Sequence, residues 1–250
     1  MTLDQEMMKN PHLDGIPFFW KGNDTAILCL HGFTATTVEV RKIAEFLHHQ
    51  GYTVSAPLLP GHGTDPQELI RTRWMDWYLE AEKSYHELAQ HYSRVFVLGE
   101  SMGALLTLHL AANYPSICGI MVFAPAIRIK YLWFSKILWP FKQYLWKGKP
   151  NPEIPQQSYK VYPLKAASSL YDLQKMIKKE FNQIQTPILV FQGKLDRTID
   201  PLGAVDLFEK IGAQDKEFIF LESSEHIILL DKDLPTVQQI CADFLQARAC

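Results

Sequence analysis

A chain of 250 residues can bury one large core, and 47% apolar with 21% charged residues is the balance of a globular protein, which excludes a disordered or fibrous chain. The 25 basic residues nearly cancel the 27 acidic ones, so the formal net charge is only −2. This balance excludes a molecule-wide field that would attract nucleic acid, and any basic surface has to be local.

The N-terminal stretch "MTLDQEMMKNPHLDG" lacks the basic start and the apolar run of a secretory signal. No segment has the roughly 18 uninterrupted apolar residues that a membrane-spanning helix needs. The four cysteines form no CxxC pair, and Cys29 and Cys118 lie in apolar runs, where a thiol acts as a small hydrophobic group. We therefore expect a cytoplasmic protein with reduced cysteines.

Short apolar runs alternate with helical patterns along most of the chain. In chain order, "FFWKG" predicts an antiparallel edge strand, and six apolar runs follow: "TAILCLHG", "TVSAPLLP", "RVFVLGE", "ICGIMVFAP", "TPILVFQG" and "EFIFLES". Strands that are apolar throughout are buried on both faces, as in a mostly parallel sheet with helices on both sides. We predict an α/β fold with its functional residues beyond the carboxyl ends of these strands.

The alternation fails between about Pro125 and Gln185. This segment carries the aromatic and basic run "RIKYLWFSKILWPFKQYLWKGKPNPEIPQQ" and then a helical pattern, "LYDLQKMIKKEFNQI". We interpret residues 125–185 as a cap inserted over the strand ends, with residues 1–124 and 186–250 forming the core.

Residues 99–103 read "GESMG" and lie between an apolar run and a helical pattern. In that setting GxSxG forms a tight, strained turn that exposes the serine, and the glycines let neighbouring backbone pass where a Cβ would collide. The N-terminus of the following helix stabilises negative charge beside Ser101. A plain turn with a solvent-facing serine is the alternative, but the strand and helix on either side favour a nucleophile.

A serine hydroxyl becomes a nucleophile when a base removes its proton, and a third group must orient that base. In this kind of fold the chain order is serine, then acid, then histidine, and Asp196 and His226 satisfy it. Asp200 competes as the acid, but it precedes Pro201 and a helical pattern, which favours an N-cap. We predict Ser101, Asp196 and His226 as the catalytic residues.

The backbone N–H groups of Phe33 and Met102 are the candidate oxyanion-hole donors. Met102 follows the candidate nucleophile directly, and Phe33 lies in the loop after the apolar run "AILCL", where His31 is expected to brace that loop. The remaining histidines show no convincing metal spacing. We therefore expect neither a metal nor a cofactor.

Five stretches carry a resemblance to a known family: "LHGFT", "GYTVSAPLLPGHGTDPQEL", "GESMG", "GKLDRTIDP" and "SSEHII". Nearly the full chain outside the cap resembles the α/β-hydrolase superfamily, and within it the small bacterial carboxylesterases and monoacylglycerol lipases. The resemblance implies the same triad and oxyanion donors as the residue-level argument. Glu100 departs from the pattern, since lipases of this group often have histidine there and the esterases an apolar residue.

The cap is locally basic and aromatic. Between Pro125 and Pro152 it has no acidic residue but six basic ones: Arg128, Lys130, Lys136, Lys142, Lys147 and Lys149. The interleaved aromatic residues are Tyr131, Trp133, Phe134, Trp139, Phe141, Tyr144 and Trp146. These side chains either line a pocket for an acyl chain, with Trp133, Trp139 and Trp146 as candidate substrate contacts, or pack on the core. Transient contact with an anionic lipid surface is the third alternative.

The resulting functional prediction is a serine hydrolase that cleaves short- to medium-chain acyl esters or monoacylglycerols through an acyl-enzyme. Its partner is a small-molecule ester, and no nucleic acid is expected. Thioesterases and carbon–carbon bond hydrolases use the same triad, because the fold does not fix the substrate. A non-catalytic, hydrolase-like binding protein is an alternative of another class, and aminopeptidase activity would need carboxylates that hold a substrate amine, for which Glu100 alone is thin support.

Overall fold

A seven-stranded sheet forms the centre of the described structure. The computed structural model describes residues 7–148 and 151–248. The sheet order is β11-β10-β6-β5-β3-β4-β2, with the bounds β2 (Phe18–Trp20), β3 (Thr25–Leu30), β4 (Thr53–Ala56), β5 (Arg94–Glu100), β6 (Gly119–Phe123), β10 (Ile188–Gly193) and β11 (Lys216–Leu221). β2 pairs antiparallel with β4, and the other neighbouring pairs are parallel. The predicted α/β fold and its antiparallel edge strand are confirmed.

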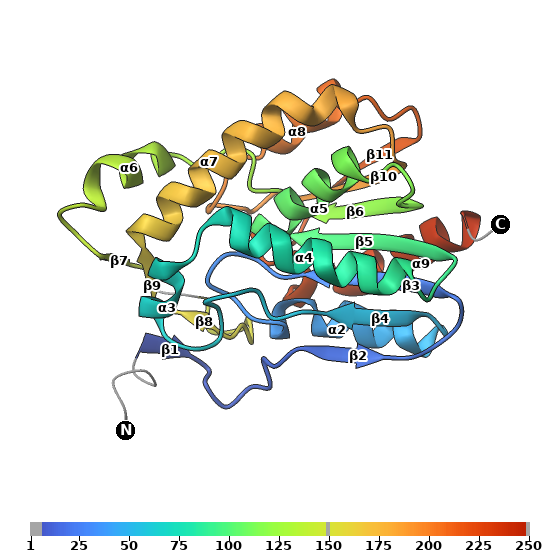
Figure 1. Ribbon diagram of the computed structural model, residues 1–250, viewed down its shortest axis with the longest axis horizontal. Helices are drawn as coiled ribbons and strands as arrows, with labels where there is room; N and C mark the ends of the chain where they lie inside the picture. The colour runs from blue at the N-terminus through green and yellow to red at the C-terminus, as the bar shows by residue number, and fades with distance from the viewer. Residues whose placement is uncertain (1–6, 149–150, 249–250) are drawn as a thin grey trace.

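Helices cover both faces of the sheet. Successive side chains of a strand point to opposite sides, and in the central strands both sets are largely apolar and need to be buried. In β3, Ala26 and Leu28 belong to one apolar cluster, whereas Ile27 and Cys29 belong to the other. The first cluster includes residues of α4 (Trp74–Ala89), α5 (Met102–Asn113), α7 (Leu164–Glu180) and α8 (Leu202–Lys210), and the second includes residues of α2 (Val38–His49) and α9 (Leu234–Ala247). Figure 1 shows α4 and α5 in front of the sheet and α2 and α9 behind it.

Parallel register brings the ends of distant strands to one edge of the sheet. β3 pairs with β5 as far as Leu30 and Gly99. β10 pairs with β11 as far as Gly193 and Leu221. The loops after these four strands therefore begin along the same carboxyl edge, where an open α/β sheet carries its functional groups.

One expectation about burial is wrong. β11 lies at the edge of the sheet and pairs with β10 alone, so its sequence "EFIFLES" is not buried on both faces. Leu221 is buried, whereas Glu217 and Phe220 are exposed. A run of apolar residues does not by itself distinguish an edge strand from a central one.

The segment after β6 forms a small irregular layer at the carboxyl edge. It contains the 3₁₀ turn η1 (Leu132–Phe134), the short helix α6 (Ser135–Leu138) and β7 (Tyr144–Trp146), which pairs with β9 (Val161–Pro163). β8 (Ser158–Tyr159) pairs with β1 (Met8–Lys9) near the start of the chain.

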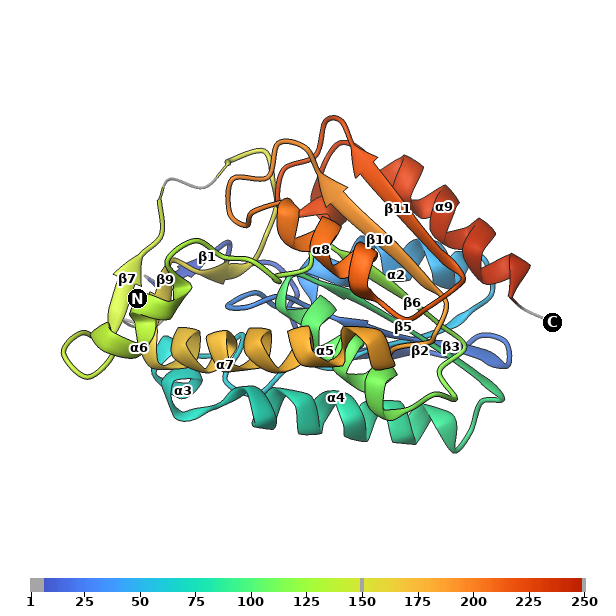
Figure 2. The same cartoon turned by 90° about the horizontal axis from the view of Figure 1, so that it is seen from above.

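The helix α7 runs back from this layer across the core, as Figure 2 shows. Its Leu170, Leu173 and Ile177 lie in the same apolar cluster as residues of α5. The division of the chain into core and cap at residues 125 and 185 stays a prediction.

The remaining short elements are α3 (Pro66–Arg71), η2 (Phe181–Gln183) and η3 (Ile228–Leu230). No helix within residues 7–148 and 151–248 is long and apolar enough to cross a membrane. Cys29, Cys118 and Cys241 are free thiols, and Cys250 lies outside the described residues. The cytoplasmic location stays a prediction.

Candidate active site

Ser101 lies in the turn between β5 and α5, with a φ of 58°. That left-handed conformation is uncommon for a residue with a Cβ. It marks a strained backbone that the surrounding structure holds in place. Both flanking glycines are needed there. A Cβ on Gly99 would lie 2.3 Å from the carbonyl oxygen of Gly103, and one on Gly103 would lie 2.1 Å from that of Leu30. The sequence therefore specifies a tight strand-to-helix turn that lifts Ser101 out of the sheet.

The three predicted catalytic side chains come together at the sheet edge. The Ser101 hydroxyl donates to Nε2 of His226 over 3.0 Å, and Nδ1 of His226 donates to Oδ2 of Asp196 over 2.8 Å. The Asp196 side chain is completely buried, while the His226 ring is 15% exposed. The arrangement orients the imidazole so that its free nitrogen faces the serine hydroxyl.

Asp196 is held as an ionised carboxylate. Burial by itself would raise the pKa of Asp196, but the charge and hydrogen bond of His226, together with the amides of Ile199 and Thr198, outweigh burial and lower that pKa below its ordinary value. Oδ1 of Asp196 accepts from both amides, at 3.0 and 2.8 Å. A carboxylate whose other oxygen is fixed in this way presents Oδ2 to the imidazole in one orientation.

The competing acid, Asp200, is engaged elsewhere. Its Oδ1 accepts from the backbone N–H of Leu202 at the start of α8, and its Oδ2 forms an ion pair with Arg128 at 3.3 Å. It therefore stabilises the first turn of α8, the role that its place before Pro201 predicts.

The loop of the predicted oxyanion donor is braced by His31. The backbone N–H of Leu59 donates to Nε2 of His31, so Nδ1 carries the ring proton and donates to the carbonyl oxygen of Gly32 over 3.0 Å. Burial lowers the pKa of His31 to about 4, which keeps the ring neutral near pH 7. The peptide group that His31 holds is the one that carries the Phe33 N–H. Met102, the other predicted donor, is the first residue of α5.

Comparison with known proteins agrees with this geometry. The chain matches the family described as serine aminopeptidase, S33, over residues 22–160 and 155–233. The chain belongs to this family of α/β hydrolases. It is 32% identical to a thermostable monoacylglycerol lipase of Bacillus sp. strain H-257, covering 96% of this chain and 98% of that protein. It is 30% identical to a carboxylesterase of Bacillus subtilis strain 168, covering 92% of this chain and 96% of that protein.

A solved structure from work on the metagenome-derived lipolytic enzymes LipS and LipT has the same fold. The TM-score is 0.90 at 26% sequence identity, over 93% of this chain and 98% of that chain. The predicted resemblance to the α/β hydrolases, and to monoacylglycerol lipases and carboxylesterases among them, is therefore confirmed.

A buried glutamate that sequence reasoning missed holds the donor loop of this hydrolase. Glu39, in the first turn of α2, accepts the backbone N–H of Gly32 on Oε2 and the amide of Gln156 on Oε1 at 2.9 Å. Burial raises the pKa of Glu39 above its ordinary value, against the opposing effect of the Gly32 hydrogen bond. The sequence signal was a glutamate between Val38 and Val40, at the inward side of an apolar helix start.

Glu100 is turned into the protein interior and away from solvent. Its side chain is fully buried, and Oε1 accepts the backbone N–H of Leu229 at 3.2 Å, three residues beyond His226. Its other oxygen, Oε2, has no hydrogen-bond partner among the described residues. Burial, together with the charge of Glu39, raises the pKa of Glu100 well above its ordinary value. Glu100 thus joins the serine turn to the segment that follows the histidine.

The cap is fastened to the donor loop. The Lys147 ammonium donates to the hydroxyl of Thr34, the Tyr159 amide donates to the Thr34 carbonyl oxygen over 2.9 Å, and the Thr36 hydroxyl donates to Gln157. Burial lowers the pKa of Lys147 to about 7. The candidate substrate contacts Trp133, Trp139 and Trp146 are exposed, and Lys149 lies outside the described residues.

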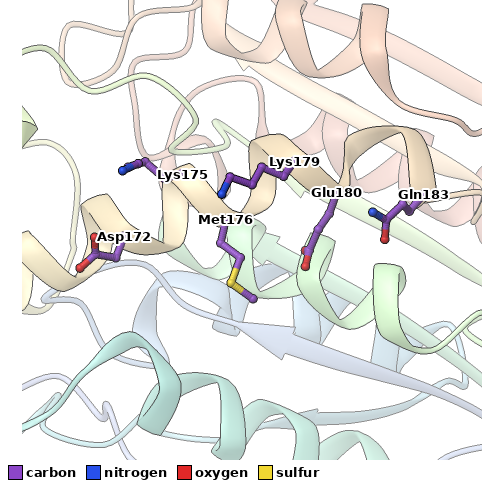
Figure 3. Close-up of a pocket in the computed structure, with 6 residues that line it drawn as sticks. All are labelled: Asp172, Lys175, Met176, Lys179, Glu180 and Gln183. Atoms are coloured by element: carbon purple, nitrogen blue, oxygen red, sulfur yellow. The ribbon is translucent and has the colours of Figure 1, made fainter.

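A separate hollow of about 480 Å³ runs along α7 and includes no predicted site residue. Figure 3 shows its lining, which consists of Asp172, Lys175, Met176, Lys179, Glu180 and Gln183. Glu180 forms a hydrogen bond with His109 of α5 over 2.8 Å, which links α7 to α5. Across residues 7–148 and 151–248, no three His, Cys, Asp or Glu side chains are grouped as metal ligands.

Proposed function

We propose that this hydrolase cleaves short- to medium-chain acyl esters or monoacylglycerols by a serine mechanism with an acyl-enzyme intermediate. Relatives at 32% and 30% identity over nearly the whole chain make the protein an ester hydrolase. The observation that carries the proposal is the continuous hydrogen-bonded chain from Asp196 through His226 to Ser101, at 2.8 and 3.0 Å. A serine hydroxyl aimed at an oriented imidazole is the arrangement of an activated nucleophile.

In the proposed mechanism, the Ser101 Oγ attacks the ester carbonyl carbon while Nε2 of His226 takes the hydroxyl proton. The protonated imidazole then gives that proton to the leaving alcohol, and the acyl group stays on the serine. Water repeats the sequence with the same histidine as base and releases the acid. Asp196 stays ionised throughout, because its pKa lies below its ordinary value, and it stabilises the imidazolium.

The backbone N–H groups of Phe33 and Met102 stabilise the negative charge that develops on the carbonyl oxygen by donating hydrogen bonds to it. Both are backbone donors, so they need no side-chain reorganisation when the charge develops. Loss of one such donor typically costs about 3 kcal/mol of transition-state stabilisation. His31 bonds the Gly32 carbonyl oxygen of the peptide group that carries the Phe33 N–H, and Glu39 accepts the Gly32 N–H of the preceding peptide group, so both support the loop of the first donor.

Aminopeptidase activity, which the description of the matched family names, finds no support at Glu100. A carboxylate that binds a substrate amine must reach the substrate, and the Glu100 side chain is fully buried and bonded to Leu229. Ester hydrolysis needs no such group. The alternatives, a thioesterase and a carbon–carbon bond hydrolase, use the same triad. The geometry of the triad does not distinguish them from an esterase, whereas assays with different substrates do.

We expect Ser101→Ala to lower kcat for a p-nitrophenyl butyrate ester by about 10⁴-fold or more, because the nucleophile is lost while binding groups remain. A panel of acyl esters, monoacylglycerols and acyl thioesters, assayed with the unaltered protein, then ranks the substrate classes. Labelling by a fluorophosphonate probe should disappear in the same variant. Full hydrolysis by Ser101→Ala, or failure of the folded protein to react with the probe, would show that Ser101 is not the nucleophile.

A further inference from the structure

The apolar side chains of the cap are exposed to solvent. Of the sixteen large hydrophobic residues exposed in the described structure, nine lie between residues 131 and 146, and we call these nine the cap patch. Tyr131, Phe141 and Trp146 are 73%, 88% and 70% exposed. Such clusters are rare on monomeric proteins unless they meet a partner or a membrane. Packing on the core does not account for these side chains.

The backbone holds the cap patch outward in a defined conformation. Tyr131 adopts a φ of 61°, a left-handed conformation that residues with a Cβ rarely adopt. The Trp133 and Phe134 rings stack with centroids 3.8 Å apart, and the amides of Phe141 and Lys142 both donate to the carbonyl oxygen of Leu138. The patch is therefore a built feature of the fold.

The segment that contains the cap patch carries charge of one sign. Residues 125–152 contain no acidic side chain. Lys136 and Arg128 are paired with Asp172 and Asp200 of other segments. Lys130 and Lys142 are exposed and have no ion-pair partner in the part of the chain that the structure describes. Exposed aromatic rings beside unneutralised lysines fit an interface where the rings enter the headgroup region and the ammonium groups meet anionic phosphate.

The cap patch lies at the same end of the molecule as the candidate active site. Figures 1 and 2 show α6 and β7 projecting at the carboxyl edge of the sheet. Trp146 immediately precedes Lys147, whose ammonium group donates to Thr34 beside Phe33. A surface bound by the patch would therefore lie next to the loop that carries the proposed oxyanion donor.

We propose that the cap patch is a docking surface for an anionic lipid bilayer. The aromatic residues supply burial at the boundary between headgroups and acyl chains, and Lys130 and Lys142 supply the charge complementarity that selects anionic lipid. Each lysine held near such a surface adds electrostatic attraction, which falls as salt screens it. The docking surface does not depend on ester hydrolysis, so its test uses protein without the proposed nucleophile.

The test is sedimentation of Ser101→Ala protein with vesicles of phosphatidylcholine alone or with about a third phosphatidylglycerol. We expect partition onto the anionic vesicles to exceed partition onto neutral ones by about tenfold or more, and to fall between low and high salt. A blue shift of tryptophan fluorescence should accompany binding, because the exposed indole rings leave water.

Two double variants separate the apolar from the electrostatic contribution. Tyr131→Ser with Phe141→Ser should abolish partition, and Lys130→Glu with Lys142→Glu should lower it about tenfold or more on anionic vesicles. The matched controls are Phe19→Ser with Phe220→Ser, at exposed positions on the two edge strands, and Lys21→Glu with Lys42→Glu, at exposed positions outside the cap. These controls should bind as the parent does. Circular dichroism and thermal melting verify that each variant is folded.

Three results would overturn the proposal. The first is no partition of the parent protein onto anionic vesicles. The second is equal loss of binding in the cap variants and their controls. The third is concentration-dependent dimerisation of the parent, measured by light scattering, that the cap variants abolish, since this would make the patch an interface between two copies of the chain.

Discussion

Glu100 and Glu39 are two buried carboxyl groups beneath the catalytic loops, and their raised pKa values have a consequence for stability. A raised pKa means that the folded protein keeps a proton which the unfolded chain releases above pH 4.5, the ordinary value for glutamate. The free energy of unfolding therefore falls as pH rises through the interval between that value and the raised pKa. Below pH 4.5 the two groups contribute no such loss.

We expect Glu100→Gln to stabilise the protein at pH 8 by about 1–3 kcal/mol and to have little effect at pH 4, because it removes the charge and keeps an oxygen for the Leu229 amide. Urea denaturation at the two pH values measures the difference. Equal effects at both would mean that Glu100 does not titrate between them. Glu45→Gln, at an exposed position of α2, is the control.

Glu39 allows a test of how the donor loop is held. Glu39→Ala removes the acceptor of the Gly32 N–H, so we expect kcat to fall about 10- to 100-fold with KM little changed. Glu39→Gln keeps one oxygen and should recover most of kcat. Steady-state kinetics with p-nitrophenyl butyrate measure both. If the two variants lose activity equally, the charge of Glu39 matters and its hydrogen bond does not.

At this scale the contact among Ser101, Asp196 and His226 was predictable, because each follows an apolar strand within five residues. Glu39 was not, since its burial depends on Gln156, which lies 117 positions later in the chain. Pattern alone places a glutamate in a first helical turn on the surface, where it suits the helix dipole. Contacts with Gly32 and Gln156, which lie outside α2, make it an interior group.

At the scale of elements, the contact between β3 and α5 decides whether the serine turn can form. The Cβ of Gly103→Ala would meet the Leu30 carbonyl oxygen at 2.1 Å, and backbone cannot move aside as a flexible side chain can. We expect a loss of about 1–3 kcal/mol in the free energy of unfolding, together with most of the activity. Gly148→Ala, whose Cβ meets nothing within 4 Å, is the matched control. Urea denaturation and fluorophosphonate labelling report the two effects, and a fully stable, active Gly103→Ala protein would refute the steric argument.

The strands were predictable because runs such as "VFVLG" are apolar over their whole length, which is typical of a buried strand. The elements of the cap were not predictable. α6 has only four residues and β7 has three, too few to establish a helical or alternating pattern. The sequence therefore left three interpretations of the cap aromatics. The exposure of these aromatic side chains depends on how η1, α6 and β7 pack, and local sequence patterns do not predict that packing.

At the scale of the whole molecule, the class of fold was predictable and the strand order was not. Fully apolar runs separated by helices indicate a parallel sheet, but the neighbour of each strand is set by long-range contacts. β3 pairs with β5, whose partner residues lie 69 positions away in the chain, as between Thr25 and Arg94. That pairing places the donor loop beside the serine, and it is a property of the assembled sheet.

The hydrogen bonds between the cap and the donor loop constrain how this enzyme opens. Thr34, Thr36 and Glu39 are bonded to the returning segment around residues 156–159. A hinged lid that lifted this segment would break these three hydrogen bonds to the region around the Phe33 loop, so opening of that kind would loosen the proposed oxyanion donor. Any opening that keeps the Phe33 loop supported therefore leaves residues 156–159 in place.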